Sequence, residues 1–388
     1  MPTTTHSSPR ARAEKFAERL GIRLPILLAP MSGACPPSLS IAVANAGGLG
    51  ACGALLMAPA EIAAWCDEFR AGSRVSGFDD SNPDKNRVSG FDDSNPDKKN
   101  SPFQINLWIP DPPPVRDAAL EQQQRDFLAQ WGPAVAPDAG NPSLPDFAAQ
   151  CEAILAASPK VASSIMGLFP PAVVSQLKSR GILWFATATT VAEARAAESA
   201  GADAIIAQGM ESGGHRGAFN AEEAQAQLVG LFALLPQIVD AVKIPVVAAG
   251  GIADSRAIAA ALILGASAVS IGTGFLRTPE AKTHPAYAAR LAGAEAHETV
   301  ITRHYSGRPA RGVVNHYIRA AHAPGAPAPA PYPIQRGLSR SMREAALRSG
   351  AEDRMQMWAG QSAKLARALP AGALTQQLWS AALALLSS

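Results

Sequence analysis

Short apolar runs recur through the first two thirds of the chain, and most of them end in glycine, proline or threonine. Within each run consecutive positions are apolar, which is typical of parallel strands that are buried on both faces. Segments with a helical pattern separate the runs. Eight runs of this kind occur, at residues 25–30, 47–54, 103–108, 161–168, 182–188, 204–209, 246–251 and 268–273.

Two of the intervening segments carry clear helix boundaries. Thr190 and Asp254 belong to the residue types that cap helix N-termini, and Gly201 and Gly265 follow the last helical positions. The alternation of eight strands with helices predicts an α/β protein with a (β/α)8 barrel, the TIM-barrel fold. A doubly wound sheet is the competing architecture, and the strand count disfavours it.

We expect the barrel to span residues 15–284 and to carry two insertions. Residues 74–99 hold one polar thirteen-residue segment twice, identical at twelve positions, which we interpret as a duplicated surface loop without a catalytic role. Residues 111–146 are rich in proline around one short polar helix and predict an insertion over the barrel. Residues 285–388 predict a mainly helical region that packs on the barrel or caps its mouth.

Charge and composition exclude several classes of protein. The net charge is +2 and no run of Lys or Arg occurs, which argues against nucleic-acid binding. No apolar run reaches the roughly 18 residues of a membrane span, and the polar N-terminus lacks the apolar core of a signal peptide. The four cysteines show no metal-ligand spacing, so we expect reduced thiols, no bound metal and a cytoplasmic protein.

Glycines follow the seventh and eighth predicted strands, where barrels often bind phosphate. Gly250 and Gly251 end one strand, and Gly272 and Thr273 end the next. Glycine lets backbone N–H groups approach a phosphate, and a helix N-terminus that follows favours its negative charge. Tight strand-to-helix turns are the alternative, but the presence of both loops in the expected register favours a phosphate site.

The segment Gly48–Gly53 fits G-x-G-x-x-G, the fingerprint of dinucleotide-binding folds. The glycines lie within an apolar run instead of opening a helix, and no acidic strand end follows about 20 residues later. We therefore interpret this segment as part of a strand.

Polar or small residues stand at three other strand ends. Asn106 and Gln208 are amides in apolar strands, and they must find partners either in the protein or in a ligand. Residues 29–34, "APMSGA", suit a flat ligand lying against the backbone, although a simple turn has the same composition.

His215 stands in the glycine-rich segment "GMESGGHRG" directly after the sixth strand. A neutral imidazole there can accept a proton or donate a hydrogen bond to a developing negative charge. We expect a functional role for His215, with Glu211 and Arg216 as candidates for tuning it. His304 and His316 flank the segment "SGRPARG", and we expect both at the surface.

The ordered set of these segments resembles the nitronate monooxygenases, formerly 2-nitropropane dioxygenases, which are FMN-dependent flavoproteins on a (β/α)8 barrel. "GGHRG" and "SGRPARG" resemble the bacterial class that acts on propionate 3-nitronate. The resemblance covers most of the chain apart from the repeat and the proline-rich linkers. It rests on "PILLAPMSG", "NAGGLGACG", "FQINLWIP", the long segments around residues 185–217 and 246–276, "YSGRPARGVVN" and "WAGQSAKLARALPAG".

The resemblance implies a role for each candidate position. His215 would match the family's active-site histidine, which binds the nitronate or acts as base on a nitroalkane. Ser212 departs from many relatives, which carry Ala. The flavin ring would be bordered by Ala29, Pro30 and Met31, and the ring or ribityl chain would form hydrogen bonds with Asn106 and Gln208. The backbone of Gly213 and Gly214 would approach the flavin. The FMN phosphate would be held by Gly250, Gly251, Gly272 and Thr273.

The implied reaction is oxidation of a nitronate with O2 to a carbonyl product and nitrite, without NAD(P)H, as in detoxification of a nitro compound. The same barrel also serves NAD(P)H-dependent quinone reductases and enoyl-thioester reductases, and a non-catalytic flavin-binding protein would keep the phosphate glycines. We expect a small-molecule substrate, no nucleic-acid or membrane partner, and either a monomer or a homodimer.

Overall fold

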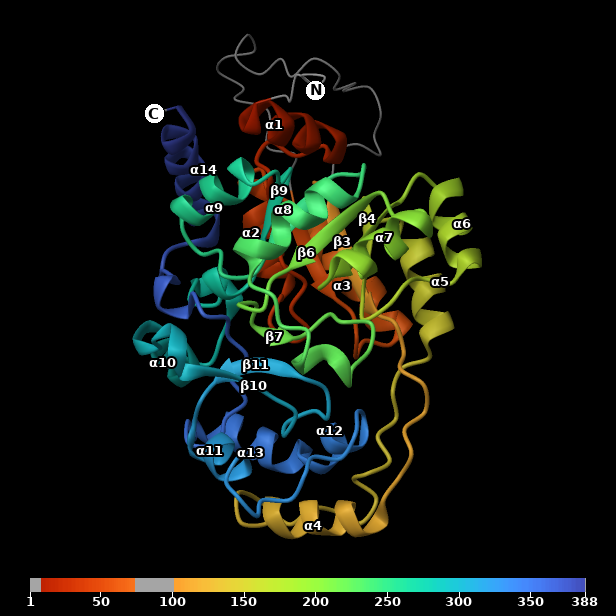
Figure 1. The fold of residues 1–388 in the computed structure, drawn as a ribbon, viewed down its shortest axis with the longest axis vertical. Helices are drawn as coiled ribbons and strands as arrows, with labels where there is room; N and C mark the ends of the chain where they lie inside the picture. The colour runs from red at the N-terminus through yellow and green to blue at the C-terminus, as the bar shows by residue number, and fades with distance from the viewer. Residues whose placement is uncertain (1–7, 74–100, 388) are drawn as a thin grey trace.

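The computed structural model describes residues 8–73 and 101–387, so the predicted duplicated loop at 74–99 lies outside the described residues. Eight parallel strands form one sheet in the order β1-β9-β8-β6-β5-β4-β3-β2 (Figure 1). A parallel bridge between Leu27 and Leu49 joins its two ends, so the sheet closes into the predicted barrel. The strands are β1 (Ile26–Leu28), β2 (Gly50–Gly53), β3 (Phe103–Trp108), β4 (Val161–Ile165), β5 (Leu183–Ala188), β6 (Ala204–Gln208), β8 (Val246–Ala249) and β9 (Ala268–Ile271).

The strands are apolar throughout because both of their faces are buried. Leu27 and Phe185 point into the barrel and pack with other interior side chains, whereas Ile26 and Leu28 pack outward in the core under the helices. Gly50 and Gly53 of the G-x-G-x-x-G segment lie in β2, and Gly48 lies in the bend before it, so the interpretation as part of a strand is confirmed for residues 50–53.

Helix α1 (Pro9–Leu20) closes the amino-terminal end of the barrel (Figure 1). Its residue Phe16 stacks on Phe185 with ring centroids 5.9 Å apart, and Leu20 is fully buried in the same cluster. Because this end is filled by side chains, the opposite, carboxyl-terminal end of the strands is left for a ligand site.

A layer of helices surrounds the strands. Thr190 Oγ1 accepts a hydrogen bond from Glu193 N, and Asp254 Oδ1 accepts one from Ala257 N, which confirms both predicted caps. The last helix, α14, returns to the barrel and packs against α2 and α9. The layer contains α2 (Pro37–Asn45), α3 (Pro59–Gly72), α5 (Phe147–Ala157), α6 (Pro171–Ser179), α7 (Val191–Ser199), α8 (Leu231–Ala241), α9 (Ser255–Ile263) and α14 (Ala371–Ser387).

A second unit, here called the lobe, lies beyond the carboxyl-terminal ends of the strands (Figure 1). Besides the helices expected after residue 285, it contains two strands that pair with β7 in an antiparallel sheet of order β10-β11-β7. The elements of this part of the chain are β7 (Gly214–His215), α10 (Pro285–Gly293), β10 (Thr299–Thr302), β11 (Ala310–Val313), α11 (His316–Ala321), α12 (Ile334–Leu338) and α13 (Arg340–Ser349).

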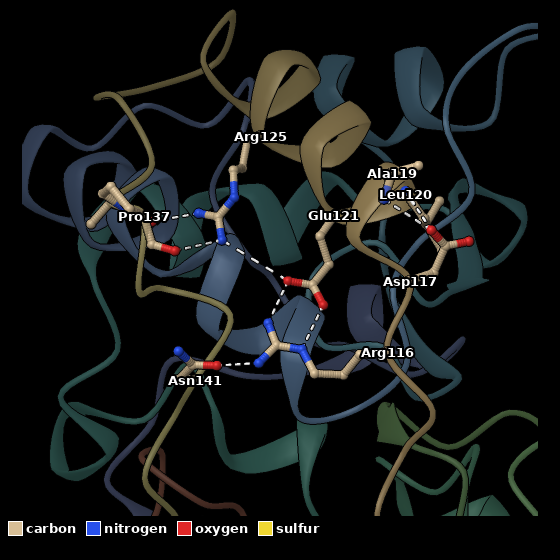
Figure 2. A network of polar contacts seen from close by, with 9 residues as sticks. Arg116, Asp117, Ala119, Leu120, Glu121, Arg125, Pro137 and Asn141 are labelled. Carbon is tan, nitrogen blue, oxygen red and sulfur yellow. Dashed lines mark hydrogen bonds and ion pairs between the residues drawn. The ribbon is translucent and has the colours of Figure 1, made fainter.

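The proline-rich insertion joins the lobe through α4 (Ala118–Leu128), which packs against α12 instead of lying on the barrel strands. Figure 2 shows the ionic contacts that hold this insertion together: Glu121 accepts hydrogen bonds from Arg116, and Arg125 donates to the carbonyl oxygen of Pro137 at 2.8 Å. The hydrogen bonds from Arg116 lower the pKa of Glu121. The helix of this insertion therefore packs on the lobe, and the placement of the insertion over the barrel stays a prediction.

Within the described residues, no helix is both long enough and apolar enough to cross a membrane.

Candidate functional site

The loops at the carboxyl-terminal end of the barrel converge on one concave surface. The strands that lead into them are buried, whereas the predicted site residues in the loops are partly exposed. Partial exposure at the mouth of a packed barrel is what residues lining a ligand site require. These residues are Ala29, Pro30, Met31, Gly213, Gly214, His215, Gly250, Gly251, Gly272 and Thr273.

Two of the loop glycines leave no room for a side chain. Gly250 has φ +108°, and a Cβ there would lie 2.5 Å from Ser212 Oγ. A Cβ on Gly213 would lie 2.5 Å from the backbone nitrogen of Gly360. The loop after β6 therefore packs closely against the loop after β8 on one side and against the backbone of residues 359–360 on the other. Glycine allows this close approach of backbone, which N–H groups need if they are to surround a small anion.

The loop after β1 lies beside the loop after β9. Ala29 N donates to Ile271 O at 2.9 Å, and a Cβ on Gly272 would lie 3.3 Å from Ala29 Cβ and 3.2 Å from Met31 Sδ. Thr273, at the start of a one-turn 3-10 helix, accepts a hydrogen bond at Oγ1 from Gly360 N at 3.0 Å. Closure of the barrel thus brings these first and last strand ends together.

The two amides in the strands have partners within the protein. Asn106 Nδ2 donates to Ser163 on β4, at 3.0 Å to Oγ. Gln208 Nε2 donates to His215 O at 3.1 Å, while its Oε1 accepts from Gly217 N at 2.8 Å. Gln208 therefore holds the segment that carries the histidine, and none of the described residues bonds to Asn106 Oδ1.

His215 lies in the two-residue strand β7, paired with Ala310 of β11. Its Nε2 is 2.8 Å from Ser306 Oγ. Two tryptophans contact its ring edge to face, Trp108 with centroids 4.6 Å apart and Trp358 with centroids 5.5 Å apart. The histidine of "GGHRG" is thereby fixed by the segment "SGRPARG", which lies far away in the sequence.

The surroundings of His215 keep its ring neutral. Burial, together with the positive charges of Arg308, Arg336 and Arg343, lowers the pKa of His215 to about 3. Near pH 7 this side chain is therefore an uncharged hydrogen-bonding group, and it is a poor proton acceptor.

The two neighbours expected to tune the histidine have other contacts. Glu211 accepts a hydrogen bond from Leu231 N at the start of α8, at 2.9 Å to Oε1. Arg216 is buried and donates to Gln208 and to Gly209 O, the latter at 2.7 Å. These residues fix the backbone of the loop, whereas arginines from the lobe set the charge around the imidazole.

Of the two histidines expected at the surface, His304 and His316, one is buried. His304 is only 7% exposed and packs on His322 with ring centroids 5.2 Å apart. Burial lowers the pKa of His304 to about 4. The expectation of a surface position is therefore wrong for His304, because the lobe packs over it, and right for His316, which is exposed.

An apolar cavity of about 90 Å³ opens beside the histidine. It is lined by Trp108 at the end of β3, by Tyr332 of the lobe and by side chains of the proline-rich insertion. Trp108 lines the cavity and also contacts the ring of His215, so the same indole side chain borders both the cavity and the histidine.

Several residues of the site were not predicted from the sequence to belong to it. Ser306, Trp108 and Trp358 contact His215, and Gly360 bonds to Thr273. The signal for two of them was present, since "SGRPARG" and "WAGQSAK" were recognised as motifs without a role. The two tryptophans also stand in such segments, Trp358 at the start of "WAGQSAK" and Trp108 in "FQINLWIP", but the sequence does not show that either ring contacts the histidine.

The loops suit a phosphate-bearing cofactor. Ser212 Oγ is buried between the loops after β6 and β8, and no described residue bonds to it. A buried hydroxyl without a partner is costly, so a ligand oxygen is a fitting partner. Among the described residues no group of three His, Cys, Asp or Glu side chains could hold a metal ion, and the four cysteines are buried and free.

A closed barrel with glycine-rich loops and a histidine at the carboxyl-terminal strand ends defines a (β/α)8-barrel enzyme. The chain belongs to the nitronate monooxygenase family, a family of flavin-dependent oxidoreductases, since the family model matches residues 14–380. It is 38% identical to the nitronate monooxygenase of Pseudomonas aeruginosa over 371 residues, which are 94% of this chain and 98% of that protein.

Solved structures agree with the fold. The nitroalkane oxidase of Streptomyces ansochromogenes has a TM-score of 0.81 and 35% identity, covering 96% of this chain and 99% of that one. FabK of Thermotoga maritima has a TM-score of 0.67 and 26% identity, covering 96% of this chain and 97% of that one.

Proposed function

We propose that the protein oxidises alkyl nitronates, such as propionate 3-nitronate, with O2 to a carbonyl product and nitrite, with FMN as its cofactor. The observation that carries this proposal is the uncharged His215 in a site surrounded by arginines. Such a site attracts an anion and lacks a strong base. It therefore favours the anionic nitronate over the neutral nitroalkane, whose carbon must first lose a proton.

The loops after β6, β8 and β9 would hold the cofactor. Gly250, Gly251, Gly272 and Thr273 would surround its phosphate, and Ala29, Pro30 and Met31 would border its ring. Gly213 and Gly214 would approach it by backbone, while Asn106 and Gln208 would lie within reach of the ring or ribityl chain. Bound FMN would supply one-electron oxidation of the substrate, which no side chain of the site can perform.

His215 would bind the nitronate group through its free ring nitrogen, because no described residue bonds to Nδ1. Ser306 Oγ lies 2.8 Å from His215 Nε2 and 3.2 Å from Arg308 O. A serine has one hydroxyl hydrogen and two lone pairs. In the structure this hydrogen is donated to Arg308 O; if it turns to Nε2 instead, the imidazole hydrogen is on Nδ1 and can be donated to a nitronate oxygen.

Detoxification of nitro compounds in the cytoplasm would suit this activity. The four free, buried thiols fit a reducing compartment. The reaction needs only the small-molecule substrate and O2 as partners.

Anaerobic mixing of the flavin-loaded protein with propionate 3-nitronate, and separately with NADH, tests the proposal. We expect a rapid change of the flavin spectrum with the nitronate and none with NADH. Bleaching by NADH alone would overturn the proposal and assign the protein to the NAD(P)H-dependent reductases on this barrel.

A further inference from the structure

The loop that follows β1 contains a buried thiol, and this thiol forms hydrogen bonds with the loop itself. Cys35 is 6% exposed, and its Sγ donates to Ala29 O at 3.1 Å. The same sulfur accepts a hydrogen bond from Met31 N at 3.4 Å. A thiol has one hydrogen to donate and can also accept through sulfur, so both bonds can exist together. The side chain thus joins the two ends of the segment 29–31, which would border the flavin ring.

Cys35 is itself fixed to the helix layer of the barrel. Its backbone oxygen accepts a hydrogen bond at 3.2 Å from the indole Nε1 of Trp65, which lies in α3. Two residues further on, α2 begins at Pro37. Burial raises the pKa of the Cys35 thiol to about 12, so near pH 7 the hydrogen that is donated to Ala29 O stays on the sulfur. The thiol is therefore a permanent attachment point for the loop.

The other neighbours of this segment are glycines at strand ends. A Cβ on Gly53, at the end of β2, would lie 2.6 Å from Ser32 N and 2.9 Å from the carbonyl carbon of Met31. A Cβ on Gly272, after β9, would lie 3.2 Å from Met31 Sδ. These glycines let the loop pack closely but have no side chain that could hold it. Among the described residues, only the Cys35 side chain forms hydrogen bonds with the backbone of residues 29–31.

We propose that Cys35 is a positioning residue, which holds the backbone of residues 29–31 in the conformation that borders the flavin ring. The inference rests on the cofactor of the proposed function and adds a residue that would act through the loop, without being a ligand itself. Because Met31 N is bonded to sulfur, this N–H group is not available to the ring. Without the thiol, the N–H group must find another partner, either the flavin or water. Either change alters the polarity beside the flavin, to which its absorption spectrum and its reduction potential respond.

FMN affinity and the spectrum of the bound flavin test this inference in two variants of the full chain. Cys35→Ala removes both hydrogen bonds, whereas Cys35→Ser keeps a donor and an acceptor at the same position. We expect Cys35→Ala to raise the Kd of FMN about threefold to tenfold, and to shift the absorption maximum and the reduction potential of the bound flavin. Cys35→Ser should restore most of the affinity and the spectrum of the unaltered protein.

Cys151→Ala is the matched control. Cys151 is a thiol of α5 that is 4% exposed, and its sulfur forms no hydrogen bond with any described residue. The two alanine variants should lose similar stability in urea unfolding, because each loses one buried sulfur. Only Cys35→Ala should change the FMN affinity and the flavin spectrum.

Unchanged FMN affinity and spectrum in Cys35→Ala, or an equal change in Cys151→Ala, would overturn the inference. A change that Cys35→Ser does not reverse would also overturn it, since the volume of the sulfur would then be the cause instead of its hydrogen bonds. If the unaltered protein binds FMN but oxidises no nitronate, the proposed reaction fails, and the same measurements still decide the role of Cys35. If it binds no FMN, the proposed cofactor and this inference fail together.

Discussion

The barrel loops and the lobe contribute to the site in different ways. The loops at the strand ends offer backbone: glycines such as Gly213 and Gly250 leave no space for a side chain, and in the proposed function their N–H groups would face the cofactor. The lobe offers side chains: Ser306 lies within hydrogen-bonding distance of the histidine, and Arg308, Arg336 and Arg343 set the charge around it. We therefore expect cofactor binding and substrate choice to be separable, since substitutions in one region should spare the function of the other.

The largest effect is expected from Gly213→Ala in the barrel loops. Its Cβ would lie 2.5 Å from Gly360 N and 2.6 Å from the carbonyl carbon of Ala359, and backbone atoms cannot move aside cheaply. Overpacking of this kind costs about 1–3 kcal/mol, which weakens flavin binding by about tenfold to hundredfold. Titration of the apoprotein with FMN, followed by flavin fluorescence, measures the change.

Gly293→Ala is the control for that substitution, because a Cβ at Gly293 in α10 meets open space. Gly214→Ala should fall between the two, since it has space but a φ of +72°, which costs an L-residue about 1–2 kcal/mol. Unchanged flavin affinity in Gly213→Ala would show that this loop does not bind the cofactor.

His215→Asn should spare the cofactor and impair the reaction. Loss of the imidazole removes one hydrogen-bond donor to the anionic substrate and should lower kcat/KM for propionate 3-nitronate by about tenfold, while the protein stays yellow. His316→Asn makes the same change at an exposed histidine and should have no effect. Turnover of nitronates at the normal rate by the flavin-loaded His215→Asn variant would remove His215 from the active site.

The smallest effect is a difference in acid stability. The pKa of His215 is about 3 in the folded protein and about 6.5 in an unfolded chain. The unfolded state therefore takes up a proton as the pH falls below about 6.5, whereas the folded state stays neutral until about pH 3. Stability is lost across that window, and at pH 5 the loss from this one group is about 2 kcal/mol.

Urea unfolding of the unaltered protein and of His215→Asn at pH 7 and pH 5 measures this loss. The variant should lose about 2 kcal/mol less, and the contribution of buried His304 cancels because both proteins contain it. An equal loss in both proteins would mean that His215 is protonated in the folded state at pH 5, as an exposed histidine would be.

The barrel and the glycine loops were predictable because their signals are local. An apolar run such as residues 204–208 is a strand whatever else the chain contains, and Thr190 caps its helix through a bond to Glu193, three residues away. The positions of the glycines after β8 and β9 then follow from the barrel geometry.

The lobe was less predictable because its contacts are long-range. β7 has only two residues, so no periodicity can reveal it, and it becomes a strand only by pairing with β11. The hydrogen-bond partners of Asn106 and Gln208 likewise depend on how the chain is arranged in three dimensions, which the sequence does not show. Buried His304 looked like a surface residue because the sequence does not show that the lobe packs over it.

The antiparallel sheet β10-β11-β7 also sets an order of events during synthesis on a ribosome. All eight barrel strands are complete by Ile271, but β11, Arg336 and Gly360 emerge much later. A nascent chain can therefore contain all eight barrel strands while His215 still lacks its serine, its second tryptophan and its arginines. The candidate site is thus completed only when the segment around Gly360 has emerged, near the end of translation.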